Sequence, residues 1–436
     1  MTRRKEALFE DIAACLPGAA ASASDRPMRW FVPGRIEVLG KHTDYAGGRS
    51  LLCAVERGFA VAAVPRSDAR VRITDAARGV CTELSLDGAA APRTGWTAYA
   101  DAVVRRIARN FPDARRGADI AFASDLPGAA GLSSSSALVV SIFTAVSAVN
   151  RLEERAEYRR EIRSLEDLAG YLGCVENGYA FGSLAGEAGV GTFGGSEDHT
   201  AILCSAAGEL AQYSFCPVRA EGRVRFPPDW TFAVGVCGVA SDKTGSAREK
   251  YNRASLAARA VLGLWNETTG RSGPTLAAAA TEAPDAPDRI RDVLRRCRHA
   301  DFTSGELLAR FDQFFEESER LVPAASQAFA RADAEALSRI VERSQELAER
   351  LLGNQIPETV TLARSARNLG AIAASAFGGG FGGSVWALVP SRSAAEFLEA
   401  WREDYCGRFR AAAARSRFFT TGAAAGLQRL DGGLDS

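Results

Sequence analysis

A serine-rich turn between a predicted strand and a predicted helix constrains this chain more than any other segment. Residues 126–137 read LPGAAGLSSSSA, after the alternating segment 119–125 and before the apolar segment 137–149. Backbone amides at a helix N-terminus, made approachable by glycines, bind anions well. The serine hydroxyls add donors, and one of them can ligate a hard cation. Alone, the segment is as compatible with an ordinary Ser/Gly helix cap as with a nucleoside triphosphate and Mg²⁺.

The glycine spacing excludes two common nucleotide-binding motifs. A Walker A loop needs a Lys after its last Gly, whereas Leu132 follows Gly131, and this segment also lacks the Gly-x-Gly-x-x-Gly spacing of a dinucleotide fold. The pattern P-x-x-x-G-L-x-S-S-x-A instead resembles the phosphate loop of the GHMP small-molecule kinases. The resemblance implies that ATP is bound in this segment by Gly128, Gly131, Ser133, Ser134, Ser135 and Ser136.

A second motif lies near the N-terminus. Residues 33–48 read PGRIEVLGKHTDYAGG and resemble the galactokinase signature, in which P-G-R, an aliphatic stretch, G, an acidic residue and H-T-D-Y follow in order. Such polar side chains beside an apolar strand can hydrogen-bond several hydroxyls of a sugar. The alternative is a polar β-turn. The resemblance implies that the sugar contacts here are made by Lys41, His42, Asp44 and Tyr45.

A third motif lies near the C-terminus. Residues 375–389 read SAFGGGFGGSVWALV and resemble the third GHMP motif, a Gly-rich loop that enters a buried strand. Glycines allow a backbone to approach a ligand closely, and the resemblance implies nucleotide contacts at Gly379 and Gly380. A flexible linker is the alternative, but Phe377 and Phe381 interrupt the glycines. The three motifs occur in the family's order, so the resemblance extends from about residue 30 to near residue 390.

The catalytic residues are predicted from the segment 194–199, GGSEDH. It resembles the galactokinase segment in which a Gly precedes the catalytic Asp by three positions. Carried over, Asp198 is the base and Gly195 is a backbone contact to the sugar. A carboxylate within reach of a sugar hydroxyl accepts its proton, and Arg35 would keep that carboxylate ionised and stabilise the transferred phosphoryl group. A helix N-cap is the alternative role for Asp198.

Two further site residues follow from the same resemblance. Glu176, on a predicted helix over 165–182, matches a helical Glu that holds Mg²⁺ together with a phosphate-loop serine, by register Ser134 or Ser135. One carboxylate, one hydroxyl and phosphate oxygens suit Mg²⁺, and a solvated carboxylate at a helix end is the alternative. Tyr251, in the segment EKYNR, resembles a tyrosine that lies against the sugar. An ordinary half-buried helix aromatic fits equally well.

Two positions of the N-terminal signature depart from the family pattern. The family has Asn where this chain has Glu37, and an acidic residue where it has Lys41. In galactokinases that acid faces the primary alcohol of the sugar, and a cation reverses what can be bound there. Lys41 either prefers a carboxylate, as in a uronic acid, or pairs with Glu37 or Glu197, or faces solvent.

The composition narrows the class of protein. The 436 residues include 53 basic and 53 acidic side chains, and this zero net charge argues against nucleic-acid binding. No apolar run reaches transmembrane length, and the first 18 residues predict an amphipathic helix rather than a signal peptide. Nine cysteines without CxxC pairs or metal spacing are typical of a reduced cytoplasmic protein. The sequence specifies no oligomeric state.

The resemblance implies a two-lobed α+β fold with the active site in the cleft between the lobes. The N-terminal lobe should carry a mixed sheet with helices on one face, and the C-terminal lobe a smaller antiparallel sheet with many helices. Prolines near 220–230 put the boundary between residues 1–225 and 226–436. Residues 28–64 are expected to form two strands and a helix, and the Gly-rich segment 180–191, an addition to the family pattern, a mobile loop. A helix of the N-terminal lobe is predicted over 96–110. The helices of the C-terminal lobe are predicted at 246–264, 286–297, 302–316, 318–330, 333–352 and 357–369.

These residues predict an ATP-dependent sugar 1-kinase that uses Mg²⁺ and acts on the anomeric hydroxyl of galactose or a related hexose. The first alternative, motivated by Lys41, is a 1-kinase for a uronic acid or another modified sugar. The second is a non-catalytic sugar sensor on the same fold. Such a sensor should have lost the base, the Arg or the Mg²⁺ ligand, and this chain retains all three.

Overall fold

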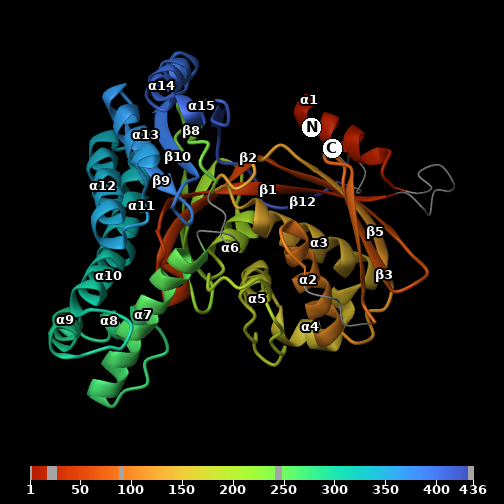
Figure 1. The fold of residues 1–436 in the computed structure, drawn as a ribbon, viewed down its shortest axis with the longest axis horizontal. Coiled ribbons are helices and arrows are strands. Elements are labelled where there is room, and N and C mark those ends of the chain that lie inside the picture. Colours follow the sequence, from red (N-terminus) through yellow and green to blue (C-terminus); the bar gives the residue numbers. More distant parts are fainter. Residues whose placement is uncertain (1, 17–26, 88–92, 241–247, 431–436) are drawn as a thin grey trace.

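The chain folds into two lobes, each built on its own sheet (Figure 1). The structure, a computed structural model, describes residues 2–16, 27–87, 93–240 and 248–430. Within this part of the chain, no helix combines the length and apolarity needed to cross a membrane. One buried hydrophobic cluster extends from the first sheet to Phe232, Trp386 and Phe419 of the second, so the two lobes share a core.

The first sheet has eight strands and is mixed. Its main order is β12-β1-β2-β5-β3-β4, with β6 bridging β2 and β7. Only β3 and β5 pair in parallel; the other pairs are antiparallel. The strands are β1 (Met28–Leu39), β2 (Arg49–Pro65), β3 (Arg70–Asp75), β4 (Val80–Ser85), β5 (Ala118–Ser124), β6 (Glu209–Ser214), β7 (Arg219–Arg225) and β12 (Gln428–Arg429).

Helices cover both faces of this sheet, although we expected them on one face only. The buried helix α3 packs on β1 and β2. The first helix, α1, contacts Ala60 and Ala62 of β2, which alternate with the residues facing α3, so it covers the opposite face (Figure 1). The helices of this lobe are α1 (Arg3–Ala13), α2 (Trp96–Asn110), α3 (Ser134–Asn150), α4 (Ala156–Glu161), α5 (Leu165–Asn177) and α6 (Glu197–Cys204), with short η2 (Asp44–Ala46) and η3 (Leu152–Glu154).

The second sheet is antiparallel, with the order β11-β8-β10-β9. Its strands are β8 (Trp230–Val236), β9 (Ala373–Phe377), β10 (Ser384–Pro390) and β11 (Arg417–Thr421). Its helices are α7 (Arg248–Thr269), α8 (Leu276–Thr281), α9 (Ala286–Arg296), α10 (Ser304–Glu316), α11 (Val322–Ala330), α12 (Ala334–Leu347), α13 (Pro357–Asn368), α14 (Ala394–Arg408) and α15 (Arg410–Ala413). The π-helical turns η4 (Glu317–Leu321) and η5 (Ala348–Leu352) follow α10 and α12, and η6 (Ser391–Ser393) precedes α14.

Most predicted helices lie within a few residues of their observed bounds, but two expectations were wrong. No helix follows the second strand within residues 28–64, because β2 continues over 17 residues as a buried strand. The helix predicted over 165–182 ends at Asn177, where Gly178 adopts the left-handed conformation that terminates helices. The last strand, β12, returns from the second lobe to pair with β1.

Candidate active site

Strand β1 carries the N-terminal signature into the centre of the molecule. Its pairing with β2 shifts register between Pro33 and Arg35 and again between Glu37 and Leu39, and such bulges re-aim side chains. At Gly34 the strand runs against the serine turn: a Cβ atom there would lie 2.8 Å from the carbonyl oxygen of Leu132. Glycine at this position therefore lets the signature and the serine turn lie side by side.

The serine turn divides its hydroxyls between two sites. Ser133 adopts a left-handed conformation (φ 58°), and α3 begins at Ser134. Ser133, Ser134 and Ser135 line an open groove together with Gly128 and Gly131. Because each helical residue turns by about 100°, Ser136 faces elsewhere: its Oγ donates to Glu176 Oε2 at 3.0 Å. The serine beside Glu176 is thus Ser136, where the sequence register had pointed to Ser134 or Ser135.

The groove also holds an aromatic cluster that sequence reasoning missed. Trp96 and Tyr99 from the first turn of α2 line it with Phe59 and Phe122 from the sheet. The ring centroids of Trp96 and Phe122 are 5.6 Å apart. The available signal was the segment WTAY at the start of a predicted helix, with two aromatic residues on one helical face.

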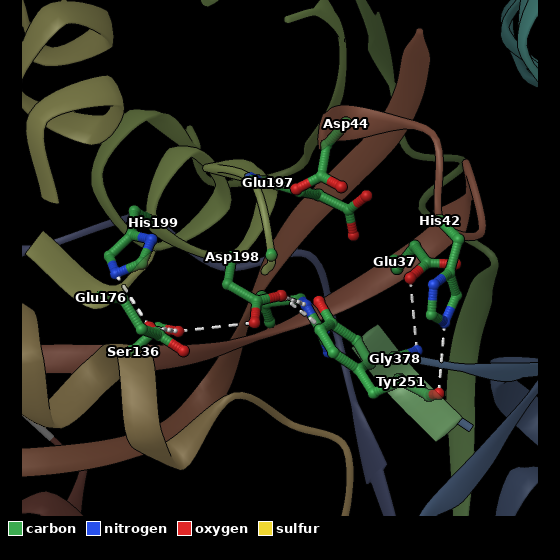
Figure 2. A pocket seen from close by; sticks show the side chains of 14 residues that line it. Glu37, His42, Asp44, Ser136, Glu176, Glu197, Asp198, His199, Tyr251 and Gly378 are labelled. Atoms are coloured by element: carbon green, nitrogen blue, oxygen red, sulfur yellow. Dashed lines mark hydrogen bonds and ion pairs between the residues drawn. The ribbon is translucent and has the colours of Figure 1, made fainter. Parts of the chain in front are cut away.

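A smaller cavity adjoins the serine turn and collects most of the predicted sugar and catalytic residues (Figure 2). It is lined from β1, the turn after it, α3, α5, α6, α7 and the third motif. Five carboxyl side chains face it, and we call it the acidic cavity. The lining residues are Arg35, Glu37, His42, Asp44, Ser136, Glu176, Gly194, Gly195, Glu197, Asp198, His199, Tyr251, Gly378 and Gly379.

An ion pair between Arg35 and Asp198 lies at the centre of this cavity. Arg35 Nε and Nη2 lie 2.8 and 2.6 Å from Asp198 Oδ1, and Nη1 donates to the carbonyl oxygen of Gly131. Arg35 is fully buried. Burial lowers the pKa of its guanidinium, but the carboxylates of Asp198, Glu197 and Glu37 together raise it above the ordinary value. Arg35 therefore stays charged and connects the serine turn to Asp198.

The turn after β1 presents Asp44 and His42 to the cavity. Asp44 Oδ2 accepts from the backbone N–H of Glu197 at 3.1 Å, and a Cβ atom at Gly195 would lie 2.4 Å from this oxygen. His42 Nε2 lies 3.2 Å from the carbonyl oxygen of Gly379, and Nδ1 lies 3.0 Å from the Tyr45 hydroxyl. A carbonyl only accepts, so Nε2 carries the hydrogen and Tyr45 donates to Nδ1.

Lys41 lies behind the cavity wall rather than in the cavity. Its side chain is 1% exposed, which excludes the solvent-facing alternative. Lys41 Nζ donates to Ser344 Oγ at 2.8 Å, and Ser344 in turn donates to Glu317 Oε1 at 2.9 Å. The signature lysine is thus held by a serine of α12 and a glutamate of η4, two residues that no sequence pattern had connected to it.

Two carboxyl groups in the cavity wall, Glu37 and Glu197, are buried, and burial shifts the pKa of each. Burial raises the pKa of Glu37 to about 7, although Lys41 and Arg35 act to lower it. Burial and the charge of Glu37 raise the pKa of Glu197 well above its ordinary value. Sequence reasoning named both residues only as partners for Lys41.

Tyr251, in the first turn of α7, closes one side of the cavity. Its ring centroid is 5.1 Å from that of His42. A Cβ atom at Gly194 would lie 2.8 Å from its hydroxyl oxygen, so glycine there lets the two segments meet. Burial raises the pKa of Tyr251 well above its ordinary value, and the side chain therefore stays a neutral phenol.

The third motif packs against the serine turn and hydrogen-bonds its backbone. Ser384 Oγ donates to the carbonyl oxygen of Ala130 at 2.5 Å, and the backbone N–H of Gly378 donates to Glu37 Oε2 at 3.3 Å. Gly379 lines the acidic cavity, and Gly380 packs against Asn354. Of the two predicted nucleotide contacts, Gly379 thus lies in this cavity and not in the groove at the serine turn.

The donors around Glu176 fit a hard divalent cation. Glu176 supplies a carboxylate, Ser136 supplies a hydroxyl 3.0 Å away, and His199 Nε2 lies 3.4 Å from Glu176 Oε2. Within the described ranges, no group of three or more His, Cys, Asp or Glu residues is arranged for a metal. With two protein oxygens as ligands, the other coordination positions of the ion would be left to phosphate and water, which is how Mg²⁺ is usually held.

The segment 180–191, expected as a mobile loop, is held against α2. Glu187 forms ion pairs with Arg105 and Arg109, and Asn110 Nδ2 donates to the carbonyl oxygen of Ala185 at 3.0 Å. The backbone N–H of Val190 donates to the carbonyl oxygen of Glu176 at 2.9 Å. The loop therefore fixes the end of the helix that carries Glu176.

Three family models match the chain in order. They are the galactokinase galactose-binding signature over residues 20–65, the N-terminal domain of GHMP kinases over 98–180 and the C-terminal domain of GHMP kinases over 325–405. Galactokinases of Actinobacillus succinogenes and of a Roseiflexus species are 35% and 38% identical over 114 and 120 residues, or 26% and 28% of this chain. Each match spans only 30% of the relative's length.

Solved structures extend the likeness to the whole fold. The galactokinase of Lactococcus lactis, solved with galactose, superposes with a TM-score of 0.77 at 19% identity and covers 98% of this chain and 100% of that one. The L. major mevalonate kinase, solved with R-mevalonate, superposes with a TM-score of 0.52 at 14% identity and covers 91% of this chain and 96% of that one. With three family models in register on this fold, the chain belongs to the GHMP kinase superfamily and carries its galactokinase-type sugar-binding signature.

Proposed function

We propose that this protein is an ATP-dependent sugar kinase that transfers the γ-phosphoryl group to the anomeric hydroxyl of a hexose. One observation carries the proposal: Arg35 lines both the groove at the serine turn and the acidic cavity. Its guanidinium bonds Gly131 on one side and Asp198 on the other. A phosphoryl group leaving the groove and a hydroxyl resting on Asp198 meet at this side chain.

The groove suits ATP. The aromatic cluster of Phe59, Trp96, Tyr99 and Phe122 offers an apolar site for the base. The serine turn offers hydroxyls and the N-terminus of α3 to the phosphates. Phosphoryl transfer depends mainly on positioning and on charge neutralisation, and the groove and Arg35 supply both.

Asp198 is the proposed base. A sugar hydroxyl becomes a better nucleophile as its proton moves to a carboxylate oxygen within hydrogen-bonding reach. The ion pair with Arg35 orients the carboxylate, and the guanidinium stabilises the negative charge that develops during transfer. After transfer, the proton leaves from Asp198 to solvent.

Ser136 and Glu176 are the proposed protein ligands of Mg²⁺. When bound there, the ion would neutralise phosphate charge beside the serine turn. Ser136 Oγ also lies 3.4 Å from Asp198 Oδ2, so the metal ligands and the base border the same space.

The sugar is proposed to bind against Asp44, His42, Gly195 and Tyr251. Each of them lines the cavity next to Asp198. The relatives and the solved structure named galactokinase support a hexose acceptor. Attack from its anomeric hydroxyl is what the resemblance to galactokinases implies. Whether that hexose is galactose itself depends on Glu37 and Lys41, which differ from the family pattern.

The two alternatives fit these observations less well. A uronic acid needs a cation in the cavity, whereas Lys41 Nζ donates to Ser344 behind its wall. A non-catalytic sensor has no need of an Arg35–Asp198 ion pair next to Ser136 and Glu176.

The proposal extends to domains and location. We propose that residues 1–225 and 226–436 are the two domains, with the reaction at their junction, while β12 ties the end of the chain back to the first sheet.

All nine cysteines are free thiols, which supports a reducing, cytoplasmic location.

Replacing the base tests the function. Asp198→Asn should reduce kcat by at least about 10³-fold, because the amide cannot accept the proton, while calorimetry still detects sugar binding. The matched control is Asp288→Asn, since Asp288 is 84% exposed on α9, and it should keep wild-type kcat. Turnover that survives in Asp198→Asn would refute the assignment of the base.

A further inference from the structure

The proposed phosphoryl transfer makes no use of two carboxyl groups in the sugar cavity, Glu37 and Glu197. They come from β1 and α6, and both line the cavity next to Asp44 and His42 (Figure 2). Their side chains are only 3% and 5% exposed. Removing a carboxylate from water is costly unless it is paired, so their presence calls for a partner.

No cation of the described cavity lining is available to them. Arg35 bonds Asp198 and the carbonyl oxygen of Gly131. Lys41 lies close enough to lower the pKa of Glu37, but its Nζ donates to Ser344. His42 has its ring nitrogens on Gly379 and Tyr45. Among the described residues, Arg35 acts on both carboxyl groups through its charge but forms its ion pair with Asp198.

Glu37 also has an oxygen that no donor reaches. Its Oε2 accepts from the backbone N–H of Gly378 at 3.3 Å, whereas Oε1 is buried and receives no hydrogen bond from the described residues. Glu197 Oε2 accepts from Ser50 Oγ at 2.7 Å. The Glu197 carboxyl group lies within hydrogen-bonding reach of Glu37, but a carboxyl donates only while it holds a proton. The cavity therefore has a buried acceptor oxygen left for a ligand, and the pair becomes negatively charged when it loses its protons.

We propose, resting on the proposed sugar kinase function, that the acceptor is an aminohexose whose ammonium group binds between Glu37 and Glu197. An ammonium group brings three donors and a positive charge, and hydrogen bonds from a charged donor to a carboxylate are about twice as strong as neutral ones. A hydroxyl brings one donor and no charge. A uronic acid would put its carboxylate beside two further carboxyl groups and is rejected.

Proton release distinguishes the ammonium from a hydroxyl. The charged and titratable groups around Glu37 are Lys41, Arg35, Glu197 and Glu317, and those around Glu197 are Glu37, Asp44, Arg35 and Asp198. Because burial raises the pKa of Glu37 to about 7 and that of Glu197 above its ordinary value, the empty pair favours the protonated form more than exposed carboxyl groups do. A bound ammonium favours the ionised carboxylates and expels a proton, whereas a neutral sugar leaves it in place.

The first experiment compares sugars on the wild-type protein with ATP and Mg²⁺. The panel is galactosamine, glucosamine, galactose, N-acetylgalactosamine and galacturonate, in which the N-acetyl sugar keeps the bulk of the amine but removes its charge. We expect kcat/KM at pH 7 to be at least about tenfold higher for one of the amines than for galactose, with no detectable turnover of galacturonate. A preference for galactose over both amines would overturn the proposal.

The second experiment assigns the preference to the pair. Glu37→Gln and Glu197→Gln each keep the shape and remove the charge, and each should lower the ratio of amine to galactose kcat/KM by about tenfold or more. Glu335→Gln is the matched control, because Glu335 is 85% exposed on α12, and it should keep the wild-type ratio. Melting curves establish that each variant is folded, and the sugar panel on the wild type decides the proposal if one is not.

Calorimetry without nucleotide separates this proposal from the kinase function. Titrations of galactosamine, glucosamine and galactose in buffers of different ionisation enthalpy should show about one proton released for the tighter-binding amine and none for galactose. Binding of the amine with proton release but no phosphorylation of any sugar would refute the kinase function alone. Phosphorylation of the sugars with equal binding of amine and galactose would refute the aminohexose alone.

Discussion

The two ends of the acidic cavity differ in how far they follow the superfamily. At the proposed transfer end, Arg35, Asp198 and Glu176 line the cavity together, and each has a close polar partner. At the sugar end, the chain carries Glu37 and Lys41 where the family has Asn and an acid. The lysine lies behind the wall and the glutamate lies in it. The comparison suggests that the chemistry is common to the superfamily and that the choice of sugar is particular to this chain.

The largest effect is expected at the transfer end. Glu176→Gln should lower kcat by about 10²-fold at fixed Mg²⁺, because an amide binds a hard cation more weakly than a carboxylate. Raising Mg²⁺ should restore part of the activity, which an initial-rate titration measures. A loss that does not respond to Mg²⁺ would remove Glu176 from the metal site and weaken the contrast between the two ends.

The next effect concerns Lys41 and stability. Lys41→Met should lower the free energy of unfolding by about 2 kcal/mol, because it leaves the buried Ser344 and Glu317 without their positive neighbour. Urea unfolding measures the change, and Lys250→Met is the control because Lys250 is exposed. An unchanged stability would mean that Lys41 does not hold the wall of the cavity.

A smaller effect is expected in the groove. Trp96→Ala should raise the KM for ATP by about tenfold, because the base loses an aromatic contact, and should leave the KM for the sugar unchanged. Initial rates with each substrate varied in turn measure both constants. An equal rise in both would show that the groove and the cavity are not separate sites.

The smallest effect depends on pH. The pKa of Glu37 is raised to about 7 in the folded protein, so the native state binds its proton more tightly than the unfolded chain does. The stability contributed by this proton is complete below about pH 4.5 and is lost as the pH rises towards 7. Relative to wild type, Glu37→Gln should therefore gain about 1 kcal/mol between pH 6 and pH 7. Parallel unfolding curves of the two proteins at these pH values measure the difference. A stability difference that is independent of pH would mean that Glu37 is ionised throughout this range.

Local sequence patterns were sufficient to predict much of the secondary structure. Helix α2 occupies the predicted residues 96–110, and α3 follows the serine turn as expected. Apolar periodicity and glycine positions are properties of neighbouring residues, so they can be read along the chain. The same reading failed within residues 28–64, because a strand buried on both faces and a helix have similar apolar runs.

The sequence by itself determined the superfamily, the order of the three motifs and the identity of the Arg35–Asp198 pair, because these depend on residue types at short spacing. Only the tertiary structure decided that Ser136 rather than Ser134 or Ser135 meets Glu176. It also decided that Lys41 turns to Ser344 while Glu37 and Glu197 face the cavity together. Such contacts join residues up to 303 positions apart. A side chain's direction depends on the elements packed around it, and these are brought together only when both lobes have folded.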